Sequence, residues 1–280
     1  MKKHTTFRVG GPARALAEPG SAEDVKSVVE FCKSEQIPYY IVGNGSNLLV
    51  SDKGYDGVII HLFKNMSAMR IEGNKVYVQA GALLSKVAVQ AGRKGVTGME
   101  FASGIPGTIG GAMVMNAGAY GGEMKDVLTS VRVMTEEGEI MELPAEELGL
   151  GYRTSIIPEK RYIVLGAVIS LTEGKKEEIK AQMDDLRQKR VSKQPLEYPR
   201  AGSTFKRPEG YFAGKLIEDA GLRGFQVGGA QVSEKHCGFV INRDHATAAD
   251  IMELMRQVQI RVKENSGVDL EPEVKRLGDE

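Results

Sequence analysis

Several features that would place a chain in other protein classes are absent from this sequence of 280 residues. Lysine plus arginine and aspartate plus glutamate both number 37, so no net positive charge is available to hold nucleic acid or an anionic membrane. No run of about 18 apolar residues occurs, and the opening segment MKKHTTFRVGG lacks the apolar stretch of a signal peptide. We therefore expect a cytoplasmic protein that binds neither nucleic acid nor membrane.

Cysteine is scarce as well, with only Cys32 and Cys237 in the chain. They lie far apart and form neither a CxxC motif nor a Cys/His ligand spacing, so we expect two buried free thiols. The histidines share no ligand spacing either, and the sequence predicts no metal site. Structural or surface roles are expected for all four: His4, His61, His236 and His245.

The pattern of apolar residues predicts a mixed chain of helices and strands. Ser21 and Thr247 are placed to cap helices, and Pro195 marks the end of a charged one. Helices are expected over 21–36, 83–95, 175–195, 211–222 and 246–267. Strands are expected over 39–43, 57–62, 75–81, 130–143 with a turn near Glu137-Gly138, 162–172, 229–233 and 238–242.

Glycine, by contrast, is abundant, and its 34 copies cluster in two segments. These are GNGSNLL (43–49) and SGIPGTIGGAMVMNAGAYGG (103–122). A pyrophosphate needs several backbone N–H groups that converge without side chains in the way, which glycine and small polar residues allow. Each segment alone could be a tight turn, but the two together favour a bound phosphate group.

Neither common nucleotide-binding fingerprint fits these segments. Gly43 and Gly45 are followed by Leu48 where the dinucleotide fingerprint needs a third glycine, which disfavours a Rossmann domain. The stretch GYFAGKL has three residues instead of four between Gly210 and Gly214, and its lysine is not followed by Ser or Thr. A P-loop ATPase is therefore not expected.

Seven motifs in one order give the chain a resemblance to a known family. They are HTTFRVGGPA (4–13), GNGSNLL (43–49), SGIPGTIGGAMVMNAGAYGG (103–122), GYRTS (151–155), AGSTFKRP (201–208), GLRGFQVGGAQVSEKHCGFVIN (221–242) and LEPEV (270–274). The chain resembles the enolpyruvylglucosamine reductases of peptidoglycan precursor synthesis along nearly its whole length. The resemblance implies an α+β chain with an FAD-binding fold of the vanillyl-alcohol-oxidase/PCMH type and a C-terminal α+β substrate-binding domain. The implied domains are 1–62, to which 273–280 return, then 63–193 and 194–272.

The resemblance also implies an activity and a cofactor. Non-covalent FAD would pass a hydride from NADPH, through flavin N5, to the enolpyruvyl group of UDP-N-acetylglucosamine enolpyruvate, and an acid would protonate the neighbouring carbon to give UDP-N-acetylmuramate. The expected flavin contacts are Gly43, Asn44, Gly45, Ser46, Asn47, Leu48, Ser103, Gly104, Pro106, Gly107, Thr108, Gly110, Gly111, Asn116, Gly118, Ala119, Tyr120 and Arg153.

Three residues match the catalytic set of that family. Arg153 in GYRTS would grip the substrate carboxylate with its guanidinium fork, where negative charge grows during the reaction. Ser203 in AGSTFK matches the proton donor, and Glu273 in LEPEV matches the partner acid. A serine hydroxyl protonates only a strongly basic carbanion and needs neighbours that help deliver the proton, for which Lys206 is a candidate.

Substrate contacts are expected from Lys193, Lys206 and Arg207, although Arg207 stands where many members have Asn and its role is left open. The segment after Arg153 lacks the long insertion that carries a tyrosine lid in one subgroup, so the chain resembles the other subgroup. The residue that covers the nucleotide instead is not indicated. The family usually has a leading helix before HTTFRVGG, and whether the N-terminus of this chain is truncated is left open.

Two alternatives remain open from the sequence. The first is another flavin oxidoreductase of the same broad fold, which would keep the glycine segments but need not keep GYRTS, AGSTF and LEPEV together. The second is a module that binds a nucleotide without turnover. We expect a monomer, while the preference between NADPH and NADH and a dependence on monovalent cations are left undecided.

Overall fold

The computed structural model describes residues 1–279, which form two compact units. Unit 1 comprises Met1–Arg14, Gly45–Asp56 and Arg190–Glu280, and unit 2 comprises Ala15–Asn44 and Gly57–Lys189. Each unit has a hydrophobic core of its own. The short glycine segment is divided at Asn44, so its two halves belong to different units.

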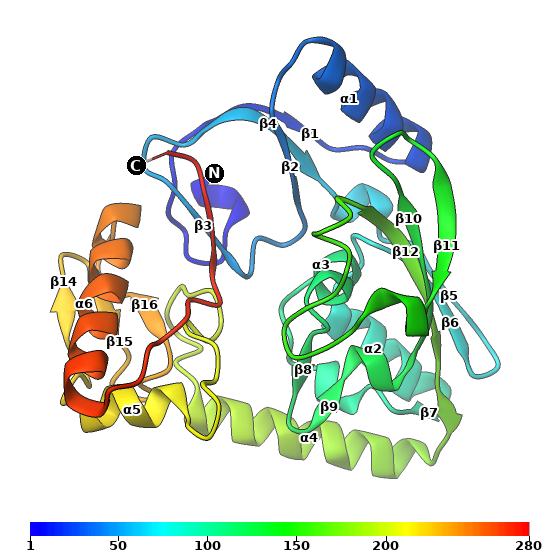
Figure 1. Ribbon diagram of the computed structural model, residues 1–280. Helices are drawn as coiled ribbons and strands as arrows, with labels where there is room; N and C mark the ends of the chain where they lie inside the picture. The colour runs from blue at the N-terminus through cyan, green and yellow to red at the C-terminus, as the bar shows by residue number, and fades with distance from the viewer. Residues whose placement is uncertain (280) are drawn as a thin grey trace. The chain divides into compact units, whose positions relative to one another are not determined.

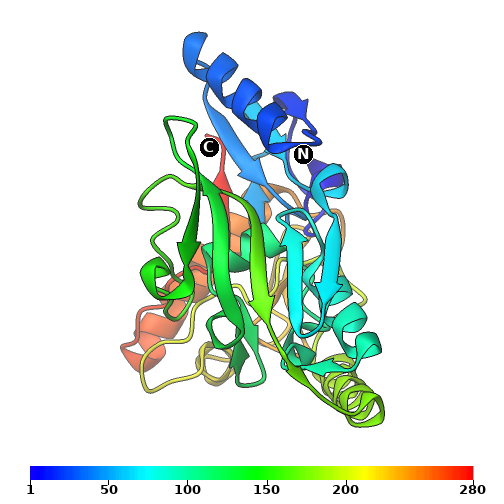
Figure 2. The ribbon, with the colours of Figure 1, turned by 90° about the vertical axis from the view of Figure 1, so that its right-hand side faces the viewer.

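Unit 2 is built on a five-stranded antiparallel sheet in the order β11-β10-β12-β6-β5, whose strands Figure 2 shows side by side. The strands are β5 (Met69–Glu72), β6 (Lys75–Gln79), β10 (Leu128–Met134), β11 (Ile140–Pro144) and β12 (Ile163–Ser170). The predicted turn near Glu137-Gly138 joins β10 to β11, and Gly138 has a φ of 83°, a conformation that glycine adopts without strain. Strand β5 is absent from the sequence-based prediction.

Three helices that lie wholly within unit 2 accompany this sheet. They are α1 (Ala22–Ser34), α2 (Leu84–Lys94) and α3 (Ile109–Val114). Ser21 caps α1 by accepting the backbone N–H of Asp24 at 3.0 Å, as predicted, and Val25, Val29 and Cys32 bury one face of the helix. The short helix α3 lies within the long glycine-rich segment, which was predicted only as a loop.

A second, three-stranded sheet has the order β1-β4-β2. Its strands are β1 (Ala13–Ala17), β2 (Tyr39–Val42) and β4 (Tyr55–His61). Strands β2 and β4 were predicted and pair in parallel, so the 43–47 segment follows directly from the carboxyl end of β2. Strand β1 was not predicted.

Unit 1 has a small antiparallel sheet, β14-β15-β16, against which the long helix α6 packs (Figure 1). The elements are β14 (Gln226–Val227), β15 (Ala230–Val232), β16 (Val240–Asn242), α5 (Ala213–Asp219) and α6 (Ala248–Ser266). The predicted cap Thr247 accepts the N–H of Asp250 at 3.0 Å, and Gly267 ends α6 in a left-handed conformation with a φ of 74°. Both ends of this helix therefore follow local sequence chemistry.

The end of the described chain returns to an early segment of unit 1. Strand β17 (Lys275–Leu277) pairs in parallel with β3 (Leu48–Val50), with Lys275 opposite Leu48.

The charged helix α4 (Lys176–Lys193) ends just before Pro195, as predicted. The remaining short elements are η1 (Lys2–His4), η2 (Lys64–Met66), β7 (Val96–Thr97), η3 (Glu100–Ala102), β8 (Gly118–Ala119), β9 (Gly122–Glu123), η4 (Met124–Asp126), η5 (Ala145–Leu148) and β13 (Thr172–Glu173). No helix among residues 1–279 has the length and apolar character needed to span a membrane.

Candidate active site

The start of the short glycine-rich segment, Gly43 and Asn44, meets the long one inside unit 2. The side-chain amide of Asn44 donates to the carbonyl oxygen of Pro106 at 2.6 Å. A Cβ atom added to Gly43 would overlap the Oγ1 atom of Thr108, so glycine is required there by the close approach of the second segment. Two of the residues predicted to hold the phosphate group, Gly43 and Asn44, are thus brought next to the long segment.

Thr108 organises the start of α3. Its Oγ1 accepts the N–H of Gly111 at 3.5 Å, while the N–H groups of Ile109 and Gly110 donate to the carbonyl oxygens of Ala82 and Ala80 at 2.9 and 2.8 Å. These three N–H groups therefore already have partners within the protein. Contact of this helix with an anion would have to use other donors of the segment or the bare Cα surface.

The lack of a side chain matters for different reasons at the two glycines in α3, Gly110 and Gly111. A Cβ on Gly110 would come within 3.2 Å of the Cβ of Ala80, so this glycine allows the helix to pack on the end of β6. Around Gly111 the added atom would meet only Thr108 Oγ1, at 3.7 Å, which is an ordinary contact. Packing within the protein does not require glycine at this exposed position, whereas the approach of a ligand to the backbone would.

The second half of the short segment is tied to two other motifs of unit 1. Gly45 has a φ of 60°, and an added Cβ there would overlap the carbonyl oxygen of His4. The side-chain amide of Asn47 donates to the carbonyl oxygen of Glu273 at 3.1 Å, and the backbone carbonyl oxygen of Asn47 accepts from the N–H of Lys275 at 3.0 Å. The GNGSNLL, HTTFRVGG and LEPEV motifs therefore share one region of this unit.

Asn116 is completely buried, and its side chain is fully engaged within unit 2. The Nδ2 atom donates to Gly151 O and to Glu123 Oε2, both at 3.0 Å, and Oδ1 accepts the N–H of Lys125 at 2.9 Å. Any contact of Asn116 with a flavin would therefore involve its backbone. Its φ of 43° lies in the left-handed region, which asparagine tolerates better than most residues.

Arg153 lies next to the wall formed by the 118–120 segment. Its Nη2 atom donates to the carbonyl oxygen of Gly118 at 3.3 Å, and its guanidinium carbon is 5.2 Å from the centre of the Tyr152 ring. The residue itself has a φ of 55°, within a tight turn closed by Gly151 and Thr154. Arg153 is thus joined to the long glycine-rich segment, as the predicted flavin contacts require.

Ser203 and Glu273 lie on neighbouring segments of unit 1. The N–H of Glu273 donates to the carbonyl oxygen of Thr204 at 2.8 Å, and a β-bridge joins Phe205 to Pro272. Glu273 is 8% exposed, whereas Ser203 is exposed and follows Gly202, whose φ is 74°. The AGSTF and LEPEV motifs are therefore adjacent, with the buried carboxylate on one and the exposed hydroxyl on the other.

The three predicted substrate cations also belong to unit 1. Lys206 pairs with Glu271 at 2.5 Å, and the guanidinium carbon of Arg207 lies 4.1 Å from the ring centre of Phe212. Lys193 is exposed at the end of α4. Each of the three can present positive charge to solvent or to a ligand.

The remaining predicted flavin residues lie within the same two motif regions. Ser103 donates its hydroxyl to the carbonyl oxygen of Glu100 at 2.8 Å, and Tyr120 is 46% exposed with a φ of 54°. Gly118 and Ala119 form β8, and Leu48 is buried at the start of β3. Ser46, Gly104 and Gly107 lie in the loops of the two segments.

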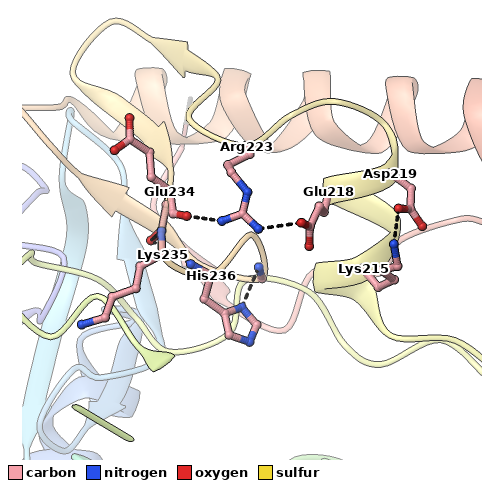
Figure 3. Close-up of polar contacts among 9 residues, drawn as sticks. Lys215, Glu218, Asp219, Arg223, Glu234, Lys235 and His236 are labelled. Atoms are coloured by element: carbon pink, nitrogen blue, oxygen red, sulfur yellow. Dashed lines mark hydrogen bonds and ion pairs between the residues drawn. The ribbon is translucent and has the colours of Figure 1, made fainter. Parts of the chain in front are cut away.

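A turn in the GGAQVSEKHCGFVIN motif is held by His236. Its Nδ1 atom accepts the N–H of Gly238 at 3.0 Å, which places the ring proton on Nε2, and burial lowers the pKa of the imidazole. Figure 3 shows Arg223 nearby, donating to Glu218 Oε1 at 2.7 Å and to the carbonyl oxygen of Glu234. These contacts join α5 to the turn that contains the histidine.

The cysteines are both buried and free, as predicted. Burial raises the pKa of each thiol, which keeps it protonated and unreactive. Within residues 1–279, no group of three His, Cys, Asp or Glu side chains has the arrangement of a metal site.

Two stretches of the chain match families of known proteins. Residues 13–144 match the sequence model of a family described as an FAD binding domain, and residues 194–277 match that of the UDP-N-acetylenolpyruvoylglucosamine reductase C-terminal domain. The UDP-N-acetylenolpyruvoylglucosamine reductase of Alkaliphilus metalliredigens is 56% identical over 279 residues, covering 100% of this chain and 92% of its own. That of Clostridioides difficile is 54% identical over 280 residues, with the same coverage.

A solved structure agrees with these sequence matches. The crystal structure of UDP-N-acetylenolpyruvylglucosamine reductase from Thermus caldophilus superposes with a TM-score of 0.85 at 38% identity, covering 99% of this chain and 97% of that one. The predicted α+β architecture and vanillyl-alcohol-oxidase type of flavin fold are confirmed. The chain therefore belongs to the family of UDP-N-acetylenolpyruvoylglucosamine reductases and is an FAD-binding oxidoreductase.

Proposed function

We propose that this chain reduces UDP-N-acetylglucosamine enolpyruvate to UDP-N-acetylmuramate, with NADPH as the source of reducing equivalents, in the synthesis of peptidoglycan precursors. The observation that carries the proposal is the 56% identity, along the whole chain, to the UDP-N-acetylenolpyruvoylglucosamine reductase of Alkaliphilus metalliredigens. The GYRTS, AGSTF and LEPEV motifs, which a flavin oxidase with another substrate need not keep together, are all present. We further propose that the protein acts as a cytoplasmic monomer.

FAD fits the segments that would hold it. Asn44 and Pro106 join the two glycine segments, and Gly111 exposes backbone that the protein itself does not cover. We assign the flavin to these segments and to the 116–120 wall beside Arg153, and we assign residues 1–62 and 63–193 to the flavin-binding domains. Bound there without a covalent link, FAD would supply the hydride that the enolpyruvyl group needs.

Arg153 would bind the substrate carboxylate. Addition of a hydride to the enolpyruvyl carbon moves negative charge onto that carboxylate, and a guanidinium can accept it through two parallel hydrogen bonds. The contact of Nη2 with Gly118 O and the position of Arg153 in a closed turn limit the freedom of the side chain. An arginine oriented in advance stabilises the charged species without a reorganisation cost.

Ser203 would then protonate the neighbouring carbon. Its exposure on a segment that follows a left-handed glycine makes the hydroxyl accessible, and Lys206 lies three residues further along. Glu273, buried on the adjacent segment, would orient the groups that deliver and replace the proton. Lys193, Lys206 and Arg207, in or next to the proposed substrate-binding domain 194–272, would provide positive charge for the diphosphate of the nucleotide.

Ser203→Ala tests this assignment. NADPH should bleach the yellow absorbance of the variant at the wild-type rate, while its return on addition of the enolpyruvyl nucleotide should be nearly abolished, because only the proton donor is missing. Stopped-flow absorbance separates the two half-reactions. Equal slowing of both would contradict the role of Ser203, and Glu273→Gln should slow only the second one.

The two alternative functions give different signals. An oxidase would consume oxygen with an alcohol and ignore the enolpyruvyl nucleotide, and a nucleotide-binding module without flavin would be colourless. NADPH consumption that requires the enolpyruvyl nucleotide would exclude both.

A further inference from the structure

The buried side chain of Asn116 joins three pieces of unit 2: the turn that carries Arg153, the β8-β9 hairpin and the short helix that follows the hairpin. One bond, to Gly151 O, fixes the backbone two residues before Arg153. A second bond, to Glu123 Oε2, fixes the carboxylate of a residue at the end of the β8-β9 hairpin. The third, from the N–H of Lys125, anchors the short helix that follows the hairpin. Both Nδ2 hydrogens are used in these bonds, so the Asn116 side chain holds the three pieces in fixed positions.

The carboxylate of Glu123 adds a negative charge to this group of contacts. It accepts from Asn116 and pairs with Lys125 at 2.9 Å. The bond to Lys125 lowers the pKa of this carboxyl, and Asn116 and Arg153 act in the same direction. Glu123 is therefore ionised at neutral pH, and its negative charge acts on the guanidinium of Arg153.

The turn that carries Arg153 is held from its other side as well. Gly151 and Thr154 exchange backbone hydrogen bonds of 3.2 and 3.4 Å, and the hydroxyl of Ser155 donates to the carbonyl oxygen of Val114 at 2.7 Å. Arg153 itself has a left-handed φ of 55°, a conformation that a bulky residue keeps only when its surroundings impose it. Of the three hydrogen bonds of the Asn116 side chain, the one to Gly151 O lies nearest in sequence to this strained residue.

We propose that Asn116 and Glu123 are positioning residues for Arg153, which fix the turn and the direction of its guanidinium before substrate binds. The proposal rests on the proposed function, in which Arg153 grips the substrate carboxylate. Neither residue touches the substrate in this scheme. A guanidinium displaced by about 1 Å would lose much of its contribution to the second half-reaction, an effect on the order of 100-fold.

The decisive variants are isosteric. Asn116→Asp replaces the donor that faces Gly151 O and Glu123 Oε2 by an oxygen, which breaks both contacts. Glu123→Gln keeps an oxygen for Asn116 but removes the charge, and it is the milder change should Asn116→Asp fold poorly. Asp126→Asn is the matched control, since its carboxylate accepts from the N–H of Glu123 and caps the same short helix.

In the holoenzyme, Asn116→Asp should slow reoxidation by the enolpyruvyl nucleotide about 100-fold, and Glu123→Gln should slow it less. Bleaching by NADPH and retention of FAD should stay at the wild-type level in Glu123→Gln, and Asp126→Asn should match the wild type throughout. In an Arg153→Lys background, Asn116→Asp should cause little further loss, because both act through the same guanidinium. Full additivity in the Arg153→Lys/Asn116→Asp double variant, or equal slowing of both half-reactions in Glu123→Gln, would overturn the proposal.

A second measurement does not depend on turnover. The side-chain ¹⁵Nε resonance of Arg153, assigned by its loss in Arg153→Lys, should be a single sharp signal in the wild-type holoenzyme and should broaden or shift in Asn116→Asp. An unchanged signal would overturn the positioning role. Wild-type protein that shows no reoxidation by the enolpyruvyl nucleotide would instead refute the proposed function, so the two failures are distinguishable.

Discussion

Gly111→Ala separates the needs of the fold from the needs of the flavin. In the folded chain the added methyl group meets only Thr108 Oγ1, at 3.7 Å, and the residue lies within helix α3. Alanine should therefore raise the free energy of unfolding of the flavin-free protein by roughly 0.5–1 kcal/mol. Flavin packed on this backbone would meet an extra methyl group, and such overpacking costs about 1–3 kcal/mol. That cost corresponds to a roughly 5- to 140-fold rise in the Kd for FAD.

The assay is a titration of deflavinated protein with FAD, followed by flavin fluorescence, together with thermal unfolding of the flavin-free form. Gly20→Ala is the control, because its methyl group would meet only Asp24 Oδ2, at 3.6 Å. Gly43→Ala should lower both stability and FAD affinity, since its methyl group overlaps Thr108 Oγ1. A wild-type Kd in Gly111→Ala would refute the placement of FAD against this helix.

Two further predictions concern stability in unit 1. Thr247→Ala removes the oxygen that accepts the N–H of Asp250 at 3.0 Å, so urea unfolding should show a loss of about 0.5–2 kcal/mol; an unchanged midpoint would mean that the cap is not stabilising. Burial lowers the pKa of His236, so the unfolded chain takes up this proton more readily, and stability should fall as the pH drops below the ordinary histidine value of 6.5. His236→Asn, which keeps an acceptor for the N–H of Gly238, should flatten unfolding free energy between about pH 7 and pH 5; an equally steep profile would assign the effect to another group.

Elements whose ends depend on local chemistry were predicted well from the sequence. Ser21 and Thr247 were named as helix caps, and each accepts the predicted kind of hydrogen bond. Pro195 and Gly267 follow the ends of α4 and α6. These signals act over three or four residues, so no knowledge of the fold is needed to interpret them.

Helix α3 was missed because its stability comes from distant segments. Glycine disfavours helix, and Gly110 and Gly111 occupy two of its six positions. The carbonyl oxygens of Ala80 and Ala82 accept the N–H groups of Gly110 and Ile109, which offsets that preference. Such tertiary contacts leave no periodic pattern in the sequence.

The candidate site was predictable only through motifs. Arg153, Ser203 and Glu273 would each look like ordinary polar residues without the order of the seven segments, and their roles stay proposals. Asn116 was predicted as a flavin contact, and Glu123 was not singled out at all. Their contacts with the GYRTS turn depend on the fold bringing residue 151 next to residue 116, which spacing alone does not indicate.

The discontinuity of unit 1 has a consequence for biosynthesis. Its hydrophobic core combines Phe7 and Leu49 with Leu270 and Val274. The core can therefore form only after the last part of the chain has been synthesised. Unit 2 ends at Lys189 and can close while the ribosome is still translating the final third of the message. During that interval the early apolar residues of unit 1, Phe7 and Leu49 among them, lack the packing partners that Leu270 and Val274 provide.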